Sequence, residues 1–201
     1  MPTGVAEIFA NRSRDDDFRL ETSRLLLRWP NVRDAHAITS YASKFEVSRW
    51  TSAIPHPYPA GAAQQFIMRA RVGNAAGAML QLVATLLRSR REVIGGVGLD
   101  LRAGKLTLSY VFSPEVWGIG YATESAEALV EAAFTMTDVG SLHSGVFIDN
   151  ERSRRVLAKV GFKFDGFVEE YSEARGAPQK TAHLKMDRQD WLARRSSKEA
   201  G

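Results

Sequence analysis

The segment from Val116 to Glu124 has the clearest capacity for chemistry in this sequence. It reads Val-Trp-Gly-Ile-Gly-Tyr-Ala-Thr-Glu, with two glycines in alternation just before a helical pattern. Glycine lets the backbone tighten until successive N–H groups point into one concavity, and a helix N-terminus adds unpaired amides and partial positive charge. The spacing therefore predicts an anion-binding turn suited to a pyrophosphate.

Two familiar phosphate loops are not matched by this segment. The dinucleotide-binding pattern needs a third glycine where this chain has Thr123, and no Gly-Lys-Ser or Gly-Lys-Thr follows for a nucleotide triphosphate loop. A short glycine-rich link between strand and helix is also common in α/β domains. The turn alone leaves both phosphate binding and a plain connection open.

The composition limits the class of protein. The chain has 201 residues, 44% hydrophobic and 25% charged, as expected for one globular domain with a sizeable core. Cysteine is absent, which excludes disulfides, thiolate zinc sites and a cysteine nucleophile, and we expect no metal ion.

With no apolar run of transmembrane length and no basic-then-apolar leader, we expect a soluble, cytoplasmic protein. The net charge of +4 comes from scattered or terminal residues and gives no support for nucleic-acid binding.

Strand and helix patterns alternate between two irregular ends. Residues 1–18 and 193–201 are expected to be flexible tails around one domain at 19–192. Strands are predicted at 25–28, 80–87, 93–99, 106–112 and 145–148, with a charged turn at 88–92 and a final hairpin over 162–169 and 181–186. Helices are predicted at 32–41, 60–71, 122–134 and 150–161. This alternation predicts an α/β fold with a mixed sheet.

The strand at 106–112 shows the clearest alternation. Leu106, Leu108, Tyr110 and Phe112 share one face of this strand, and the residues between them share the other. Pro114 ends the strand because it cannot donate to a ladder. The glycine turn follows three residues later.

Three segments together resemble the GNAT superfamily of N-acetyltransferases, in the group containing the ribosomal-protein N-terminal acetyltransferases. They are Glu21–Arg28, Ser109–Glu124 and Asp149–Phe162, and the likeness covers about residues 20–192. Three segments in this order and spacing are more specific than the turn alone. The resemblance implies a single-domain α/β fold with helices flanking a mixed central sheet, in which two parallel strands splay apart to hold acetyl-CoA.

The resemblance also implies which residues contact acetyl-CoA. The backbone of Val111 to Ser113 would bond the pantetheine arm, and the amides from Ile119 to Thr123 would hold the pyrophosphate. Asn150 would reach the pantetheine, and Ser153 would lie near the thioester sulfur. The implied cofactor-binding set is Val111, Phe112, Ser113, Trp117, Gly118, Ile119, Gly120, Tyr121, Ala122, Thr123, Asn150 and Ser153. Trp117 stands where many superfamily members have glutamine or arginine.

The implied reaction is direct attack of a primary amine on the thioester in a ternary complex, with no covalent enzyme intermediate. A backbone N–H on the splayed strand can stabilise the developing oxyanion. Other members have a tyrosine where this chain has Leu157. The hydroxyl of Ser153 is therefore expected to protonate the departing thiolate, directly or through a water, with Asn150 as the second residue of the catalytic set.

The general base is left open by the sequence. Four carboxylates could accept the proton of the acceptor ammonium, directly or through water: Glu46, Glu115, Glu124 and Asp149. Glu124 also fits a first-turn acid favoured by the helix dipole, and Asp149 also fits a helix cap. The four histidines, which are His36, His56, His143 and His183, are expected to be structural.

Two further groups of residues have two interpretations each. Arg152, Arg154 and Arg155 face the positive end of a helix, which is unfavourable by about 0.3–1 kcal/mol each. They could bind the ribose 3′-phosphate of CoA or be solvated arginines on an exposed face. The aromatic residues Trp50, Tyr58 and Phe66 could line an acceptor pocket or belong to the core.

The acceptor is expected to be the primary amine of a protein N-terminus or of a small molecule. Relatives often carry an aspartate shortly after the glycine of the last hairpin, whereas Ala177 and Pro178 follow Gly176 here. A family-typical acceptor is correspondingly less secure. No membrane or nucleic-acid partner is expected, and a homodimer is left open. The alternative function is a non-catalytic CoA-binding or sensing module with the same fold.

Overall fold

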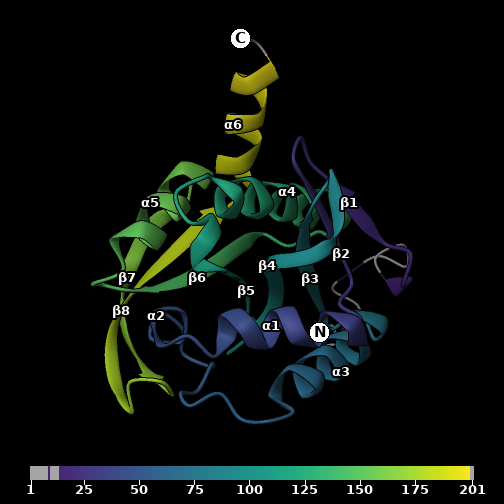
Figure 1. Ribbon diagram of the computed structural model, residues 1–201. Coiled ribbons are helices and arrows are strands. Elements are labelled where there is room, and N and C mark those ends of the chain that lie inside the picture. Colours follow the sequence, from purple (N-terminus) through teal and green to yellow (C-terminus); the bar gives the residue numbers. More distant parts are fainter. Residues whose placement is uncertain (1–8, 10–13, 200–201) are drawn as a thin grey trace.

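The computed structural model describes residue 9 and residues 14–199. One mixed sheet runs through this part of the chain (Figure 1). Its strands are β1 (Arg19–Glu21), β2 (Leu25–Arg28), β3 (Met79–Leu86), β4 (Ser89–Arg102), β5 (Lys105–Phe112), β6 (Ser141–Phe147), β7 (Lys163–Ser172) and β8 (Ala177–Asp187). The order across the sheet is β1-β2-β3-β4-β5-β6-β8-β7. The predicted α/β fold with a mixed sheet is confirmed.

Strands β5 and β6 are parallel and touch at a single register position, Thr107 opposite His143. All other neighbouring strands are antiparallel. Beyond this point β5 runs on to Phe112 and β6 to Phe147 without pairing, so the expected splay is present. The hydroxyl of Ser144 donates to the carbonyl of Leu108 at 3.0 Å, in place of the next backbone bond.

Helices cover both faces of the sheet (Figure 1). On one side lie α1 (Ala35–Ala42), α2 (Phe45–Ser48) and α3 (Ala62–Ala75); on the other lie α4 (Tyr121–Met136) and α5 (Glu151–Val160). Helix α6 (Arg188–Glu199) projects from the side of α4 and α5. Short 3-10 turns at Val32–Asp34 and Pro114–Val116 precede α1 and the glycine turn.

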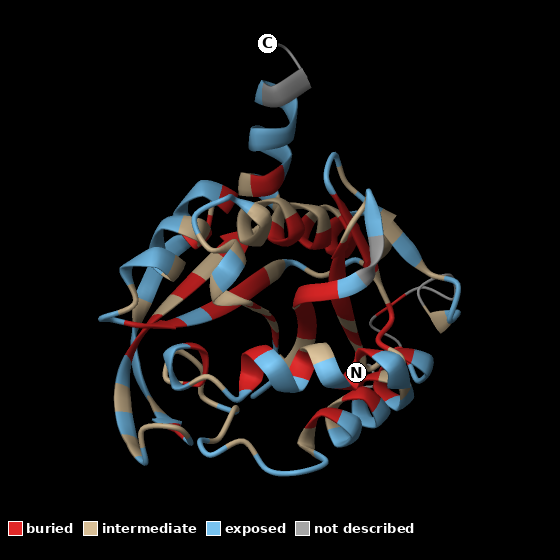
Figure 2. Ribbon diagram, viewed as in Figure 1, coloured by how far each residue is buried: buried red, intermediate tan, exposed pale blue. Residues whose placement is uncertain are grey.

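Each helical layer packs on its own apolar cluster. The larger cluster joins the sheet to α4 and α5, and Leu108, Leu129 and Leu157 are almost fully buried in it. The smaller cluster joins α1 and α3 to β3 and β4, through residues such as Ile67 and Val83. Figure 2 shows buried residues along the sheet and on the helix faces turned toward it. Burial of one such leucine contributes about 1.5–3 kcal/mol.

The element boundaries differ from the sequence predictions in a few places. The predicted turn at 88–92 is shorter, because β4 begins at Ser89, which pairs with Leu86. β6 begins at Ser141, four residues before the predicted start, because the polar residues His143 and Ser144 are buried and pair with β8 although they give no apolar strand pattern. The sequence analysis did not predict β1, α2 or α6. These elements are short or weakly patterned, and contacts with the rest of the fold define them.

Both predicted tails overlap with described residues. Phe9 is buried in the larger cluster, and Asp16 pairs with Arg71 at 2.8 Å. Residues 1–8 and 10–13 lie outside the described part of the chain. Helix α6 continues across residues 193–199. The boundaries of the domain at 19 and 192 stay a prediction.

No helix within residues 14–199 is long and apolar enough to cross a membrane.

Candidate active site

The glycine turn joins the end of β5 to the start of α4 with its main-chain donors exposed. Gly118 and Gly120 adopt left-handed φ values of +81° and +98°, a conformation that any residue with a Cβ adopts only under strain. Gly120 is the N-cap of α4, and no side chain caps it. The first amide of the helix with a backbone acceptor is that of Glu124, which donates to Gly120 O at 3.1 Å. Within the described residues, the amides from 118 to 123 are left for an external anion.

Glu124 ties this turn to the connection between β1 and β2. Its carboxylate accepts hydrogen bonds from Thr22 Oγ1 at 2.6 Å, Ser23 Oγ at 3.0 Å, and the backbone and side chain of Arg24 at 2.9 and 2.6 Å. Burial alone would raise the pKa of Glu124, but these hydrogen bonds outweigh it and the pKa is lowered. The carboxylate is therefore ionised, and both of its oxygens accept hydrogen bonds. This suits a structural role, in which Glu124 links the turn to residues 22–24, better than the role of a general base.

Arg24 also places a cation directly beside the turn. Its Nη1 donates to Ile119 O at 3.2 Å, and the guanidinium lies 4.7 Å from the centroid of the Tyr121 ring. A Cβ on Gly120 would lie 3.4 Å from Nη2 of this arginine. Sequence analysis did not single out Arg24. Its position inside the first of the three matching segments was the available signal.

The end of β5 presents backbone donors to the gap between β5 and β6. The amide of Ser113 donates to Ile94 O on β4 at 2.9 Å. Because bonding directions alternate along an antiparallel pair, the N–H groups of Tyr110 and Phe112 point the other way, into the gap. The carbonyl of Phe112 accepts from the indole of Trp117 at 2.8 Å. Of the three residues expected along the pantetheine arm, Phe112 thus offers its amide, while the amide of Ser113 is occupied.

A pair of hydroxyl groups links β5 to α5, the helix that follows β6 in the chain. The Tyr110 hydroxyl lies 2.6 Å from Ser153 Oγ and donates to Ser153 O at 3.1 Å. Asn150 is the N-cap of α5, and its side-chain oxygen accepts from the Ser153 amide at 3.1 Å. Burial raises the pKa of Tyr110 well above its usual range, so this residue keeps its proton at neutral pH. The sequence predicted Tyr110 only as part of an apolar strand face and missed this contact.

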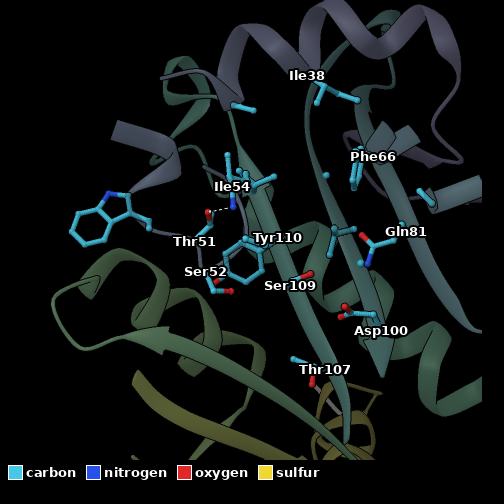
Figure 3. A pocket seen from close by; sticks show the side chains of 18 of the residues that line it. Ile38, Thr51, Ser52, Ile54, Phe66, Gln81, Asp100, Thr107, Ser109 and Tyr110 are labelled. Atoms are coloured by element: carbon cyan, nitrogen blue, oxygen red, sulfur yellow. Dashed lines mark hydrogen bonds between the residues drawn. The ribbon is translucent and has the colours of Figure 1, made fainter. Parts of the chain in front are cut away.

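A cavity of about 900 Å³ opens beside this pair. It lies between β3–β5, the layer of α1 and α3, and the loop at residues 50–59, and it reaches Tyr110 and Ser153. Figure 3 shows Ile38 and Phe66 at one side of β5 and the loop with Thr51 and Ile54 at the other. Trp50, Tyr58 and Phe66 line the cavity, and the last two also pack against the smaller cluster.

Glu170 is the carboxylate that the cavity wall offers from β7. A Cβ on Gly145 of β6 would lie 3.4 and 3.5 Å from its two oxygens, and Glu170 itself lines the cavity. Among the described residues, no hydrogen bond or ion pair engages this carboxylate. The sequence analysis missed it, because one glutamate in a charged hairpin has no distinguishing local pattern.

The four carboxylates named from the sequence lie elsewhere. Glu115 is hydrogen-bonded by Lys44 and Ser113, which lower the pKa of Glu115 to about 2. Asp149 pairs with Arg175 at 2.9 Å. Glu124 is engaged as described above, and Glu46 is exposed on α2. None of the four lines the cavity.

The arginines at the start of α5 are all exposed, but they differ in their contacts. Arg152 lies 5.2 Å from the centroid of the Trp117 ring, beside the glycine turn. Arg155 approaches Glu151 one helical turn away at 3.5 Å. Arg152 thus contacts Trp117 at the start of the glycine turn.

Comparison with known proteins bears on what this cleft holds. A family model described as an acetyltransferase (GNAT) domain matches residues 24–163. The curated but uncharacterised N-acetyltransferase YoaA of Bacillus subtilis (strain 168) is 29% identical over 177 residues, which is 81% of this chain and 92% of the relative.

Solved structures share the fold at lower identity. The ribosomal-protein-S5-alanine acetyltransferase of Vibrio fischeri superposes with a TM-score of 0.73 at 20% identity, covering 87% of this chain and 99% of its own. The spermidine N-acetyltransferase of Vibrio cholerae, solved with CoA and spermine, gives 0.70 at 17% identity, covering 85% and 99%. At these identities the likeness establishes the fold.

The tie made by Glu124 gives a testable prediction. We expect Glu124→Gln to cost about 1–3 kcal/mol of unfolding free energy in urea titration, because it loses a charge-assisted bond to Arg24. The amides of Arg24 and residue 124, which are hydrogen-bonded in the native structure, should also exchange faster with deuterium. The matched variant Glu151→Gln, which removes only an exposed pair, should change stability by less than about 0.5 kcal/mol.

The same prediction has a pH dependence. Hydrogen bonding holds the pKa of Glu124 below its ordinary value of 4.5, so its stabilisation is complete above pH 4.5 and is lost as the pH falls through the folded-state pKa. The difference between wild type and Glu124→Gln should shrink on acidification. A difference that is the same at acidic and neutral pH would contradict the assignment.

Proposed function

The chain belongs to the GNAT family of acetyltransferases, and on this premise we propose that it transfers the acetyl group of acetyl-CoA to the primary amine of a small molecule or a protein N-terminus. One observation carries the proposal: the Tyr110–Ser153 hydroxyl pair and the unpaired carboxylate of Glu170 line the same cavity where β5 and β6 separate. This arrangement offers a proton donor and a proton acceptor, which aminolysis of a thioester requires.

The residues present fit the phosphates and pantetheine of acetyl-CoA. The left-handed glycines and the unbonded amides from 118 to 123 suit the pyrophosphate, with Arg24 and Arg152 as nearby cations. The gap between β5 and β6 suits the pantetheine, whose amides can pair with the free backbone groups of Tyr110 and Phe112. When bound, acetyl-CoA supplies an activated acetyl thioester at the inner end of this gap.

Each proton in the reaction has a carrier in this chain. Glu170 accepts a proton from the acceptor ammonium, directly or through a water, and the free amine forms the new N–C bond at the thioester carbonyl. The N–H of Tyr110 also faces the gap, deeper than that of Phe112, and donates to the carbonyl oxygen as negative charge develops there. As the C–S bond breaks, Ser153 gives its proton to the sulfur and receives the proton of Tyr110 through their shared hydrogen bond. The attacking nitrogen loses its second proton as the amide forms, and this proton returns to Tyr110, directly or through water, while Glu170 releases its own proton to solvent. Asn150 holds Ser153 in place by capping α5.

The cavity lining favours an amine attached to an apolar group. Aromatic and aliphatic side chains from α1, α3 and the loop at 50–59 make up much of its wall. A polyamine would need several free carboxylates, and the cavity has two, Asp100 and Glu170. Asp100 is already bonded by Arg102 at 3.0 Å. We therefore favour a monoamine, either a small molecule or the end of a peptide chain.

The alternative is a CoA-binding or sensing module that does not turn over. The unpaired Glu170 favours the enzyme, because a sensor has no need of a free carboxylate beside the thioester. A cytoplasmic location follows from the sequence as a prediction.

Thiol release from acetyl-CoA across a panel of primary amines tests the function directly. We expect turnover with apolar monoamines, and at least a tenfold loss of acetyl-CoA affinity in Gly120→Val by calorimetry, because the left-handed N-cap cannot accept a Cβ without strain. Gly104→Val is the control, since Gly104 has φ +76° in open space away from the cleft. Binding without turnover would favour the sensing module, and no binding would overturn both functions.

The hydroxyl pair predicts a graded loss of turnover. Ser153→Ala should lower kcat about 100-fold with the acetyl-CoA affinity within about twofold of wild type, because the thiolate loses its proton donor. Tyr110→Phe should lower kcat about tenfold, since Ser153 keeps its own hydroxyl. Ser40→Ala and Tyr171→Phe, both exposed and outside the cavity, should leave kcat unchanged. An unaltered kcat in Ser153→Ala assigns the proton to another donor.

Glu170→Gln tests the base. We expect kcat/KM to fall about 100-fold at neutral pH, because the neutral amide of glutamine cannot accept the proton of the acceptor ammonium. Glu169→Gln is the control, because its side chain alternates to the exposed side of β7. A kcat/KM equal to that of wild type in Glu170→Gln would remove Glu170 from the mechanism.

A further inference from the structure

Three potential metal ligands, one each from β6, β7 and β8, lie close together in the sheet. They are His143 on β6, Asp165 on β7 and His183 on β8, and one ligand atom from each lies within 4.8 Å of the others. The two imidazole rings stack with centroids 5.2 Å apart and planes inclined by 22°. None of the three lines the acetyl-transfer cavity. Among the described residues, this is the one group with such a geometry.

His143 has a ring nitrogen without a partner. The side chain is 7% exposed, and its Nδ1 is buried with no hydrogen bond in the described structure. The other nitrogen, Nε2, lies 3.1 Å from the hydroxyl of Ser141. If Ser141 accepts the Nε2 proton, Nδ1 presents its lone pair, as in metal sites where a ligating histidine donates its second N–H to a neighbour. A buried, unbonded imidazole nitrogen otherwise has an energetic cost.

His183 and Asp165 are within hydrogen-bonding distance of each other at the position where a cation could bind. His183 Nδ1 lies 3.2 Å from Asp165 Oδ2, and their side chains are 15% and 43% exposed. Asp165 belongs to an irregular stretch of β7, where the register shifts between Phe164 and Phe167 and Gly166 has φ +111°. The backbone ladder is interrupted at this stretch, so fewer hydrogen bonds oppose a small shift of Asp165.

We propose that His143, Asp165 and His183 form a binding site for a divalent transition-metal ion such as Zn²⁺, separate from the acetyl-transfer cleft. Two imidazoles and a carboxylate are typical zinc ligands, and water can complete a tetrahedron. Ligand atoms around such an ion lie about 3.3 Å apart, so the more exposed Asp165 and His183 must close toward His143. The sequence analysis expected no metal ion and four structural histidines. His143, Asp165 and His183 are far apart in the chain and form no ligand-spacing motif that could have indicated this site.

The positive charges of two nearby lysines are offset by carboxylates and do not prevent a cation from binding at this site. Lys185 is paired with Asp187 at 2.8 Å, and Lys163 with Asp190 at 2.6 Å, so both ammonium groups are offset by carboxylates. Lys163 and Lys185 therefore add no net positive charge beside the three ligands.

The site lies at the point where the sheet opens. His143 is the residue of β6 that pairs with Thr107 of β5, in the one register position before the strands separate. A bound ion would link β6 to β7 and β8 and stiffen one wall of the gap without touching the cavity. We expect it to raise thermal stability and to leave acetyl transfer largely unchanged.

Calorimetric titration of the full chain with Zn²⁺ tests the proposal. The protein must be untagged and treated with a chelator, because a polyhistidine tag binds the same ion. We expect one saturable ion per chain, loss of that binding in His183→Ala, and weakening by about tenfold or more in Asp165→Asn. His36→Ala, which removes an exposed histidine of α1, should bind as wild type does. Binding that is absent in wild type or unchanged in His183→Ala would overturn the proposal.

Two further readouts separate a built site from surface binding. Co²⁺ bound at the site should give the visible absorption of a low-symmetry, four-coordinate ion, absent in His183→Ala. Binding should release protons and weaken as the pH falls through the histidine range, because the ligands must be deprotonated. Acetyl transfer by His183→Ala is measured in parallel, so a failed metal site and a failed acetyltransferase assignment give different results.

Discussion

The cleft exists because the parallel pairing of β5 and β6 is limited to one residue pair, after which the two strands separate. Two strands that separate inside a domain leave backbone N–H and carbonyl groups without ladder partners, and buried groups of that kind are costly. This chain satisfies several of them with side chains: Ser144 bonds Leu108 O, and the indole of Trp117 bonds Phe112 O. The donors still facing the gap are the ones a bound amide or thioester can use.

The glycine turn depends on a similar compensation. Positive φ values at Gly118 and Gly120 and an uncapped helix start make a favourable anion site but a poor structural element. Glu124 corrects this from within the same helix, because its carboxylate binds three successive residues of the neighbouring connection. These hydrogen bonds hold the start of the helix in place without using the amides of residues 118–123, which can still bind a ligand.

Much of this could be predicted from the sequence, because regular patterns report on local structure. The alternation along residues 106–112, the amphipathic helix after the turn and Gly161 as a helix stop each depend on residues close together in the chain. Tyr110 and Glu170 were missed for the opposite reason. What distinguishes Tyr110 is a hydroxyl 2.6 Å from a serine on another element, and what distinguishes Glu170 is the lack of a partner. Neither property is encoded in the neighbouring residues.

The hydrogen bond between Tyr110 and Ser153 has a mechanical meaning as well as a chemical one. Its two ends belong to β5 and α5, which lie on opposite sides of the gap, so its length of 2.6 Å measures how far apart those two elements stand. A short bond lengthens only at an energetic cost, and it therefore acts as a tether that limits how wide the gap can open. A cleft that opened wider would therefore separate Tyr110 from Ser153 and interrupt the path of a proton between them.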